Sequence, residues 1–415
     1  MPRFVFALAL VLPLAACAIG MPRVPMDRFV AGDLPAVAAQ MNAELGRGPA
    51  ANRALVLDVL GECELFAGEL DAAWRHLAEA GCIMGDWAAS GGEQFAAVVG
   101  SESSKTYKGD PYEKAMNAFY LALTYLWRGE PDNARASLKR GILADAEVAD
   151  AESRADNPLL FWLAGRMSQL MGLPEDAEDF FREAREANAF ALQHGSTGDR
   201  DGVVLGAPGS GNVVLLVACG LGPEKFAAGG MRQLARFRPR PSPVRGARIA
   251  VDGGAPIRTA VLCDVDYQAR TRGGTEMEGI REGKAVFRRS ALISGEVLLR
   301  VAACAPRCDD AAVTALVGGS LLALGLLTTS AADARHWPTL PATVQALCLD
   351  LPPGPHDLAV EFLDGADRHV PGLDQRWSIV VPDAGASFYL FRSLPGLDRL
   401  LQARGAARDP SEVSP

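Results

Sequence analysis

Between residues 34 and 195, hydrophobic and polar positions alternate in a way that predicts helices arranged in pairs. Each pair is joined by a glycine, which accepts the left-handed conformation that ends a helix, and proline suits the start of the next helix. The three turns are Gly68-Glu69-Leu70, Gly129-Glu130-Pro131 and Gly172-Leu173-Pro174. We therefore predict three helical hairpins.

Small and large side chains recur at matching positions around these turns. The small residues are Gly61, Ala122 and Gly165 before the turn and Ala73, Ala134 and Ala177 after it, and the large ones are Leu77, Leu138 and Phe181. This pattern resembles the tetratricopeptide repeat, in which small residues let paired helices approach each other. The turn glycines are 61 and 43 residues apart, whereas a regular array repeats every ~34 residues. The pattern predicts a degenerate repeat with insertions, and a generic helical bundle is the alternative.

From residue 200 onward the pattern changes to short apolar runs separated by glycine and proline turns, which is typical of strands. The runs are residues 213–218, 248–251, 259–266, 343–351, 358–362, 377–381 and 387–391. One or two helices are expected over 276–303. We predict an α+β protein with an all-α, tetratricopeptide-like domain at 34–195. A mixed, mainly antiparallel α+β domain follows at 200–400.

An uncharged, strongly apolar stretch covers residues 311–332. It is long enough to cross a bilayer, but its three glycines favour a helix packed inside the protein. The tail after residue 400 is polar and contains proline, so residues 401–415 are expected to be disordered.

The N-terminus has the pattern of an export signal. A short basic start precedes an apolar run too short for a stable membrane span, and Leu14-Ala15-Ala16-Cys17 follows. This ending resembles the bacterial lipobox. It predicts a signal peptide at 1–16, a lipidated Cys17 and a linker at 17–33, with an ordinary secretory signal as the alternative. Several acyl chains on one residue anchor a protein firmly. Ala18 favours the periplasmic face of the outer membrane.

Charge adds one candidate site. The chain of 415 residues has a net charge of −9 and a pI near 5.2, which argues against a general nucleic-acid binder. Against that background, four arginines are interleaved with prolines in a stiff segment: Arg236, Arg238, Arg240 and Arg245. Guanidinium groups on such a segment can meet phosphate or carboxylate groups of an envelope polymer or lipid. A solvated loop that compensates the acidic surface is the alternative.

The cysteine and histidine positions indicate one candidate disulfide and no zinc site. Cys304 and Cys308 could form a disulfide across a tight turn in an oxidising periplasm. No second cysteine pair or nearby histidine completes a zinc site, and we expect neither a metal nor a cofactor.

We nominate no catalytic residue. The glycine-rich stretch 206–212 lacks the Gly-Lys-Ser/Thr ending of a phosphate loop, and is expected to lead into a strand. The serine-hydrolase elbow and the His-Glu-x-x-His motif are both missing from the sequence. His336 and His356 are expected to form hydrogen bonds in turns. Asp264 and Asp266 could point to one side of a strand and share proton transfer or a cation, although exposed strand-end acids are commoner.

Four segments give the chain a wider resemblance. They are Tyr107–Lys114, Cys219–Lys225, Asp333–Pro341 and Leu351–His356. In combination they are similar to an uncharacterised family of proteobacterial tetratricopeptide-repeat lipoproteins. The resemblance implies a cell-envelope lipoprotein with no established activity, and it assigns no functional residue.

Two functions follow as expectations. The first is a membrane-tethered scaffold whose repeat groove binds another envelope protein, because repeat solenoids present concave binding surfaces. The second is an enzyme or accessory factor that acts on an envelope polysaccharide through the C-terminal domain. A pocket with converging polar groups in that domain would favour the second function.

Overall fold

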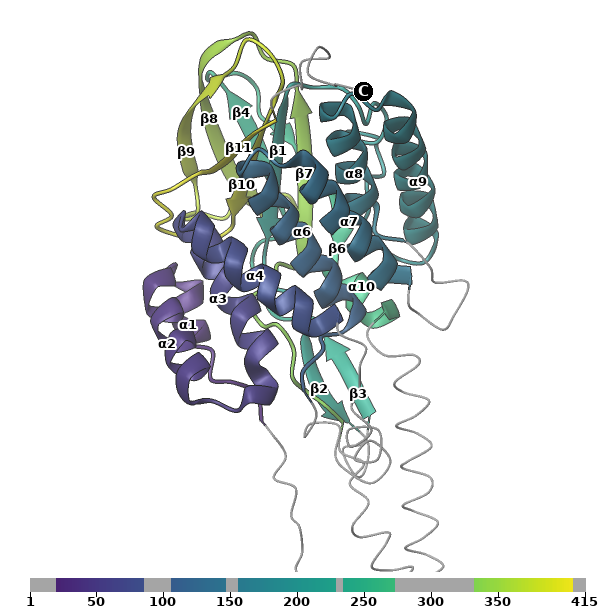
Figure 1. The fold of residues 1–415 in the computed structure, drawn as a ribbon. Helices are drawn as coiled ribbons and strands as arrows, with labels where there is room; N and C mark the ends of the chain where they lie inside the picture. The colour runs from purple at the N-terminus through teal and green to yellow at the C-terminus, as the bar shows by residue number, and fades with distance from the viewer. Residues whose placement is uncertain (1–19, 86–105, 147–155, 229–233, 273–331, 406–415) are drawn as a thin grey trace, which may run out of the picture.

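The computed structural model describes residues 20–85, 106–146, 156–228, 234–272 and 332–405 (Figure 1). The signal peptide with Cys17, the proposed Cys304–Cys308 pair, and the helices expected at 276–303 and 311–332 therefore lie outside the described residues, apart from Ala332. Within the described part, no helix is both long enough and apolar enough to cross a membrane.

The helical part begins earlier than the sequence predicts. Helix α1 (Met26–Val30) lies in the segment expected to be a linker, and it is followed by α2 (Leu34–Arg47) and the short 3₁₀ helix η1 (Ala50–Asn52). Phe29 of α1 is fully buried in the main hydrophobic core. The linker prediction is therefore wrong for this stretch, because burial of one aromatic side chain orders a helix too short to give a sequence pattern.

Three helical hairpins follow, as the sequence predicts. They are α3 (Arg53–Ala67) with α4 (Leu70–Gly85), α6 (Pro111–Trp127) with α7 (Pro131–Ala146), and α8 (Pro158–Leu170) with α9 (Pro174–Gln193). The turn glycines Gly68, Gly129 and Gly172 have φ values of 80°, 74° and 70°, the left-handed region that favours glycine. The expected contact between small and large residues is also present. A Cβ atom on Gly165 would lie 2.4 Å from Phe181 Cε1, and one on Gly61 would lie 2.7 Å from Leu77 Cγ.

The strands form two larger sheets and a separate hairpin. The five-stranded sheet has the order β11-β10-β1-β7-β6, and the four-stranded sheet has the order β5-β4-β8-β9. Strands β2 and β3 pair only with each other in the described residues. The bounds are β1 Val213–Cys219, β2 Glu224–Ala228, β3 Leu234–Arg238, β4 Gly246–Val251, β5 Ile257–Arg258, β6 Ala260–Asp264, β7 Thr343–Leu349, β8 Gly354–Leu363, β9 Gln375–Val381, β10 Ala386–Arg392 and β11 Leu401–Gly405.

The α+β class is confirmed, with helices in the N-terminal part and strands in the C-terminal part. All the described strand pairs are antiparallel except β1 with β10, which run parallel. Each of the seven predicted apolar runs corresponds to a strand. Strand β11 corrects the prediction of a disordered tail, because residues 401–405 pair with β10 and Leu401 is buried.

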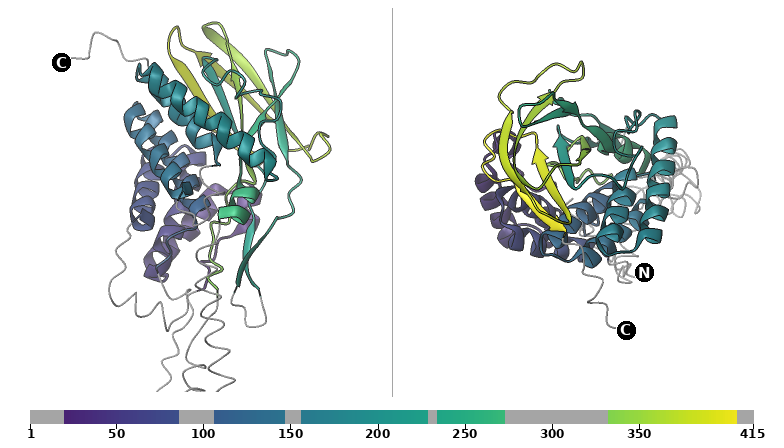
Figure 2. Two further views of the ribbon diagram at one scale, coloured as in Figure 1. Left: turned by 90° about the vertical axis from the view of Figure 1, so that its right-hand side faces the viewer. Right: turned by 90° about the horizontal axis from the view of Figure 1, so that it is seen from above.

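The layers are helices, then the five-stranded sheet, then the four-stranded sheet. Alternate residues of β1 show this order: Val214 and Leu216 join a core with the helices, whereas Leu215 joins a second core with Val360 of β8 and Ile249 of β4. A strand buried on both faces is apolar throughout, as β1 is. Figure 2 shows, from above, the helices curving around one side of the strands. The inner helices α3, α6 and α8 are consequently buried along nearly their whole length.

Candidate functional site

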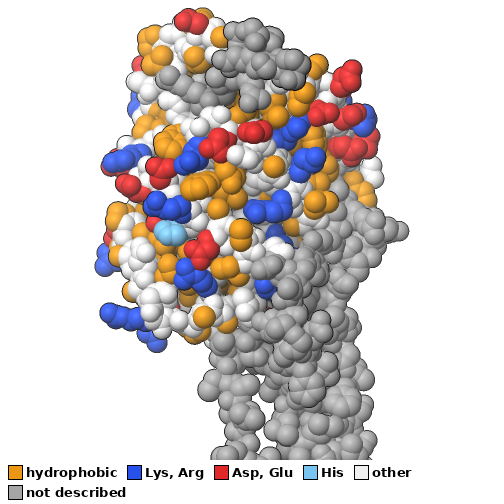
Figure 3. Space-filling view, in the orientation of Figure 1, with side chains coloured by type: hydrophobic (Ala, Val, Ile, Leu, Met, Phe, Trp, Pro, Cys, Tyr) orange, Lys and Arg blue, Asp and Glu red, His pale blue; other side chains and the backbone are white. Residues whose placement is uncertain are grey.

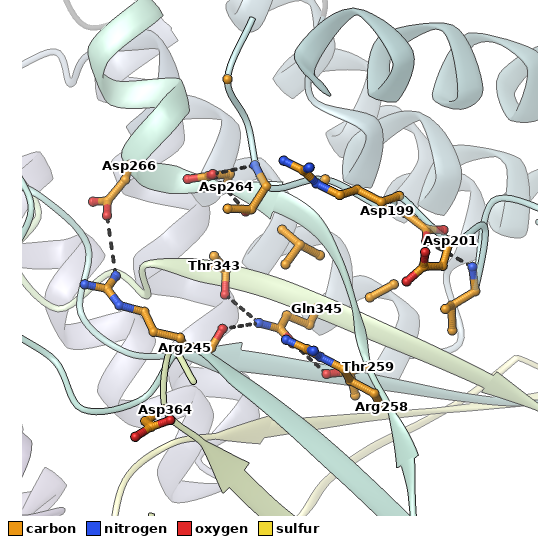
Figure 4. A pocket seen from close by; sticks show the side chains of 18 of the residues that line it. Asp199, Asp201, Arg245, Arg258, Thr259, Asp264, Asp266, Thr343, Gln345 and Asp364 are labelled. Carbon is orange, nitrogen blue, oxygen red and sulfur yellow. Dashed lines mark hydrogen bonds and ion pairs between the residues drawn. The ribbon is translucent and has the colours of Figure 1, made fainter. Parts of the chain in front are cut away.

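A polar cavity of about 640 Å³ lies where the helical part meets both larger sheets (Figure 4). Its walls come from the loop after α9, the ends of β4, β5 and β6, the start of α10 (Val265–Arg272), the beginning of β7 and the turn after β8. We call it the junction cavity. Its charged lining residues are Asp199, Asp201, Asp264, Asp266, Asp364, Arg200, Arg245, Arg258 and Arg270.

Asp264 holds one wall of the cavity in place. One of its oxygens accepts hydrogen bonds from the backbone N–H (3.0 Å) and the hydroxyl (2.9 Å) of Thr197. The other accepts from the backbone N–H of Tyr267 at 3.0 Å, in the first turn of α10, where a side-chain oxygen satisfies a donor that the helix leaves open. Both oxygens are therefore committed to structure. Asp264 ties the loop after α9 to α10.

Asp266 is the most perturbed group in the cavity. Strand β6 ends at Asp264, so Asp266 lies in α10 and the predicted pair does not share a strand face. Burial, together with the charge of Asp264, raises the pKa of Asp266 to about 6, although Arg245 and Arg270 act in the opposite direction. Its Oδ2 lies 3.8 Å from the Arg245 guanidinium, while its buried Oδ1 has no hydrogen-bond partner among the described residues. Asp266 can thus change protonation state near neutral pH.

The opposite wall is a chain of neutral hydrogen-bonding groups. The Thr259 hydroxyl donates to Gln345 Oε1 at 2.6 Å, and the Gln345 amide donates to Thr343 Oγ1 at 3.0 Å and to the backbone carbonyl of Arg245 at 2.9 Å. These bonds fix the Gln345 amide of β7 against the residues that precede β4 and β6. This wall of the cavity is therefore a rigid polar surface, which a ligand can contact without reordering it.

The arginines complete a lining of mixed charge. Arg258 pairs with Asp367 at 2.5 Å, and Arg270 donates to the backbone carbonyl of Asp266 at 3.2 Å. Arg245 is 42% exposed at its side chain, and the close-up shows it directed at Asp266. Guanidinium donors, carboxylate acceptors and hydroxyl groups converge here, which suits a ligand rich in hydroxyl groups that also carries an acidic group. The described residues contain no group of three or more side chains placed to hold a metal ion.

The four arginines singled out in the sequence do not form one site. Arg236 and Arg238 lie on β3, where Arg238 pairs with Glu224 of β2 at 2.8 Å. Arg240 instead donates to the backbone carbonyl of Pro338 and approaches His336 Nε2, each at 2.8 Å. Only Arg245 of these four lines the junction cavity.

The other candidate groups lie in loops and in one strand: His336 lies in a loop before β7, whereas His356 lies on β8 and not in a turn as expected. Residues 206–212 form a loop that leads into β1, as expected. His336 Nδ1 lies 3.0 Å from the Ala334 carbonyl, and burial lowers the pKa of His336 to about 4. His356 lies 2.7 Å from Asp252, which raises its pKa. The described cysteines, Cys63, Cys82, Cys219, Cys263 and Cys348, are free thiols.

A buried ionic network joins the helices to the sheets outside the cavity. Glu62 of α3 and Arg392 of β10 are both fully buried, with 3.9 Å between the charged groups. Glu62 also accepts hydrogen bonds from Trp337 Nε1 at 2.9 Å and the Thr339 hydroxyl at 2.5 Å. Burial raises the pKa of Glu62 to about 7 despite these partners. The pair therefore stands between α3 and the central sheet with almost no access to water.

A second part of the same network surrounds the start of α6. Lys225 of β2 pairs with Asp110 at 2.5 Å, and both side chains are less than a tenth exposed. Glu113 accepts from the backbone N–H of Asp110 at 2.7 Å and from that of Trp337 at 2.5 Å. Three of the four segments behind the family resemblance, Tyr107–Lys114, Cys219–Lys225 and Asp333–Pro341, thus meet at one place. Their contacts fasten the two parts of the fold together, and they lie apart from the cavity.

Three residues named from the sequence line the junction cavity: Asp264 and Asp266, for which exposed strand-end acids were the favoured interpretation, and Arg245 of the arginine-rich segment. Thr197, Arg258 and Gln345 were missed. These residues are single polar positions in segments far apart along the chain, and no spacing connects them. Only the fold brings them together.

The chain matches no protein-family model and no curated protein.

Proposed function

We propose that this protein is an outer-membrane lipoprotein, anchored through acyl chains on Cys17 at the periplasmic face. The proposal is supported by the lipobox-like Leu14-Ala15-Ala16-Cys17 behind a short apolar run. The similarity to tetratricopeptide-repeat lipoproteins agrees with it. The three helical hairpins, with close contact between glycine and a large side chain in two of them, support their assignment as degenerate tetratricopeptide-like repeats.

We further propose that the protein binds an acidic envelope polysaccharide in the junction cavity and serves as an accessory factor for it. The observation that carries this proposal is the cavity itself: about 640 Å³ with carboxylates, guanidinium groups and hydroxyl groups converging from separate elements. Both oxygens of Asp264 hold the fold through hydrogen bonds, so Asp264 is not free to act as the second carboxylate of a pair with Asp266. A binding role fits this arrangement better than paired-carboxylate catalysis.

Arg245→Ala is expected to weaken binding of an acidic saccharide about tenfold or more, because a hydrogen bond to a charged group contributes ~1.5–3 kcal/mol. Calorimetric titration with soluble peptidoglycan fragments and acidic polysaccharide fragments measures this. Arg376→Ala is the matched control, since Arg376 is an exposed arginine on β9 outside the cavity. Equal loss in both variants, or no binding of any fragment to the wild type, would rule the proposal out.

A scaffold role through the tetratricopeptide-like helices is the second candidate. The five-stranded sheet covers the inner face of these helices, so the outer surface of the helical part is the one that remains for a partner. Hydrophobic side chains lie among charges of both signs on the face in Figure 3. Two of the exposed large hydrophobic residues belong to the three helical hairpins: Leu143 of α7 is 66% exposed and Trp127 of α6 is 40% exposed.

This second candidate predicts a specific protein adduct. A photo-crosslinking amino acid at Leu143 should give one adduct of discrete mass in intact cells. The same amino acid at Val380 of β9, which is 53% exposed, should give none. A scaffold role through these helices would be excluded by identical adduct patterns at the two positions.

A further inference from the structure

Several distant parts of the chain meet around the 3₁₀ helix η1. The Asn52 amide donates to the backbone carbonyl of Gly20 at 2.9 Å, and the backbone N–H of Tyr107 donates to the Ala51 carbonyl at 2.7 Å. Arg335 donates to Asn52 Oδ1 at 3.0 Å and to the Ala51 carbonyl at 3.3 Å. One small region therefore holds Gly20, η1, Tyr107 and Arg335 together.

The β2–β3 hairpin belongs to the same end of the molecule. Lys225 of β2 pairs with Asp110, three residues after Tyr107. Figure 1 shows β2 and β3 extending from the lower end, whereas β8 and β9 occupy the upper end. We call the region of Gly20, Ala51–Asn52, Tyr107, Arg335 and the β2–β3 hairpin the Gly20 end.

The distance from the lipidation site to this end is short. Two residues, Ala18 and Ile19, separate Cys17 from Gly20, and the three residue-to-residue steps of a fully extended chain cover at most ~11 Å. Asn52, which holds Gly20, is only 2% exposed and fixed by Arg335. An acyl anchor at Cys17 therefore leaves no long tether between the bilayer and the folded body.

One chemical feature of the Gly20 end suits a lipid surface. Strand β3 carries Arg236, which is exposed, and Arg238, whose side chain is 60% exposed and pairs with Glu224 of β2. Guanidinium groups bind phosphate well, and basic side chains near an anionic membrane surface are attracted to it.

We propose that the Gly20 end lies against the phospholipid headgroups of the bilayer, with β3 in contact with them and the β8–β9 end directed away. The proposal rests on acylation of Cys17, which is part of the proposed function. The partner is the phospholipid headgroup layer. The surface that meets it is a rigid face of the folded body, which extends well beyond the acylated residue itself. The junction cavity and the exposed helices then face the periplasm at a fixed orientation.

The test uses the full-length acylated protein in vesicles of phosphatidylethanolamine and phosphatidylglycerol that contain a clickable phospholipid. A photo-crosslinking amino acid replaces Arg236 on β3 in one variant and Val380 on β9 in the other, both exposed positions far from Cys17 in sequence. The Arg236 position should give a severalfold higher yield of lipid adduct than the Val380 position. Mass spectrometry of the N-terminal peptide, with Cys17→Ser as the reference, reports acylation in the same samples.

The outcomes separate the two proposals. Acylated protein with equal adduct yields at the two positions, or a higher yield at Val380, overturns the orientation and leaves the lipid anchor standing. A Cys17 that carries no acyl chains overturns the anchor, and the orientation falls with it.

Discussion

Arg392→Ala is expected to destabilise the folded state by ~3–5 kcal/mol, the cost of leaving one buried charge without its partner. In the native protein the Arg392 guanidinium donates to the backbone carbonyls of Gly220 at 2.7 Å and Thr339 at 2.8 Å, besides facing Glu62. Removing it leaves two carbonyls and a carboxyl in a dry environment. Urea unfolding followed by circular dichroism measures the change in the free energy of unfolding. Arg376→Ala, at an exposed site of β9, should change it by less than ~0.5 kcal/mol.

The same variant should change how stability depends on pH. Burial raises the pKa of Glu62 from its ordinary value of 4.5 to about 7 in the folded protein, so the folded state binds more protons than the unfolded state between these pH values. Stability therefore falls as pH rises from ~4.5 to 7. Arg392 lowers the Glu62 pKa, so its removal raises that pKa further and extends the decline above pH 7. The loss caused by Arg392→Ala should consequently be larger at pH 8 than at pH 6, and an equal loss at both would contradict the role of the ion pair.

Gly165→Ala is expected to destabilise the protein by ~1–3 kcal/mol through overpacking. The new methyl group would lie 2.4 Å from the ring of Phe181 and 3.1 Å from the backbone carbonyl of Ala177. Phe181 is only 3% exposed, so its ring has little room to move. The free energy of unfolding in urea reports the effect.

Gly46 provides the control for this substitution. It lies in α2, and a Cβ atom there would meet nothing within 4 Å. Because alanine favours the helix over glycine by up to ~1 kcal/mol, Gly46→Ala should leave stability unchanged or raise it slightly. Equal changes in the free energy of unfolding for the two variants would show that the close approach of α8 and α9 does not restrict the size of residue 165.

The sequence predicted those parts of the fold that depend on local signals. Gly68, Gly129 and Gly172 marked the hairpin turns because their backbone conformation restricts the residue type. The buried strands were recognisable because β1 is apolar on both faces. Strands β2 and β3 were missed because they are short, and Lys225 and Arg236 interrupt their hydrophobic pattern. The packing of the sheet on the inner helices was also unforeseen, since a helix buried by another helix and one buried by a sheet have the same apolar sequence.

The candidate site was less predictable for a physical reason. Asp264 and Asp266 were chosen as a carboxylate pair on a strand, yet the strand ends at Asp264 and a helix begins at Val265. Because the backbone changes from strand to helix at this point, Asp264 caps the helix, and Asp266 is the acid whose pKa is raised. The residues opposite them, Thr259 and Gln345, are 86 positions apart. Their proximity is a property of strand pairing, which local patterns do not encode.

The parallel pairing of β1 with β10 also determines when this protein can finish folding. Val213 is paired with Ser387 and Ala218 with Arg392, so the central strand must wait for a segment more than 170 residues further along the chain. Pairing between such distant segments is slow because the chain entropy must be lost before the contacts form. Until β10 and β11 arrive, the five-stranded sheet that covers the apolar inner faces of α3, α6 and α8 is incomplete. Because the N-terminal helices are synthesised first, their apolar inner faces stay exposed to aggregation until the last strands are in place.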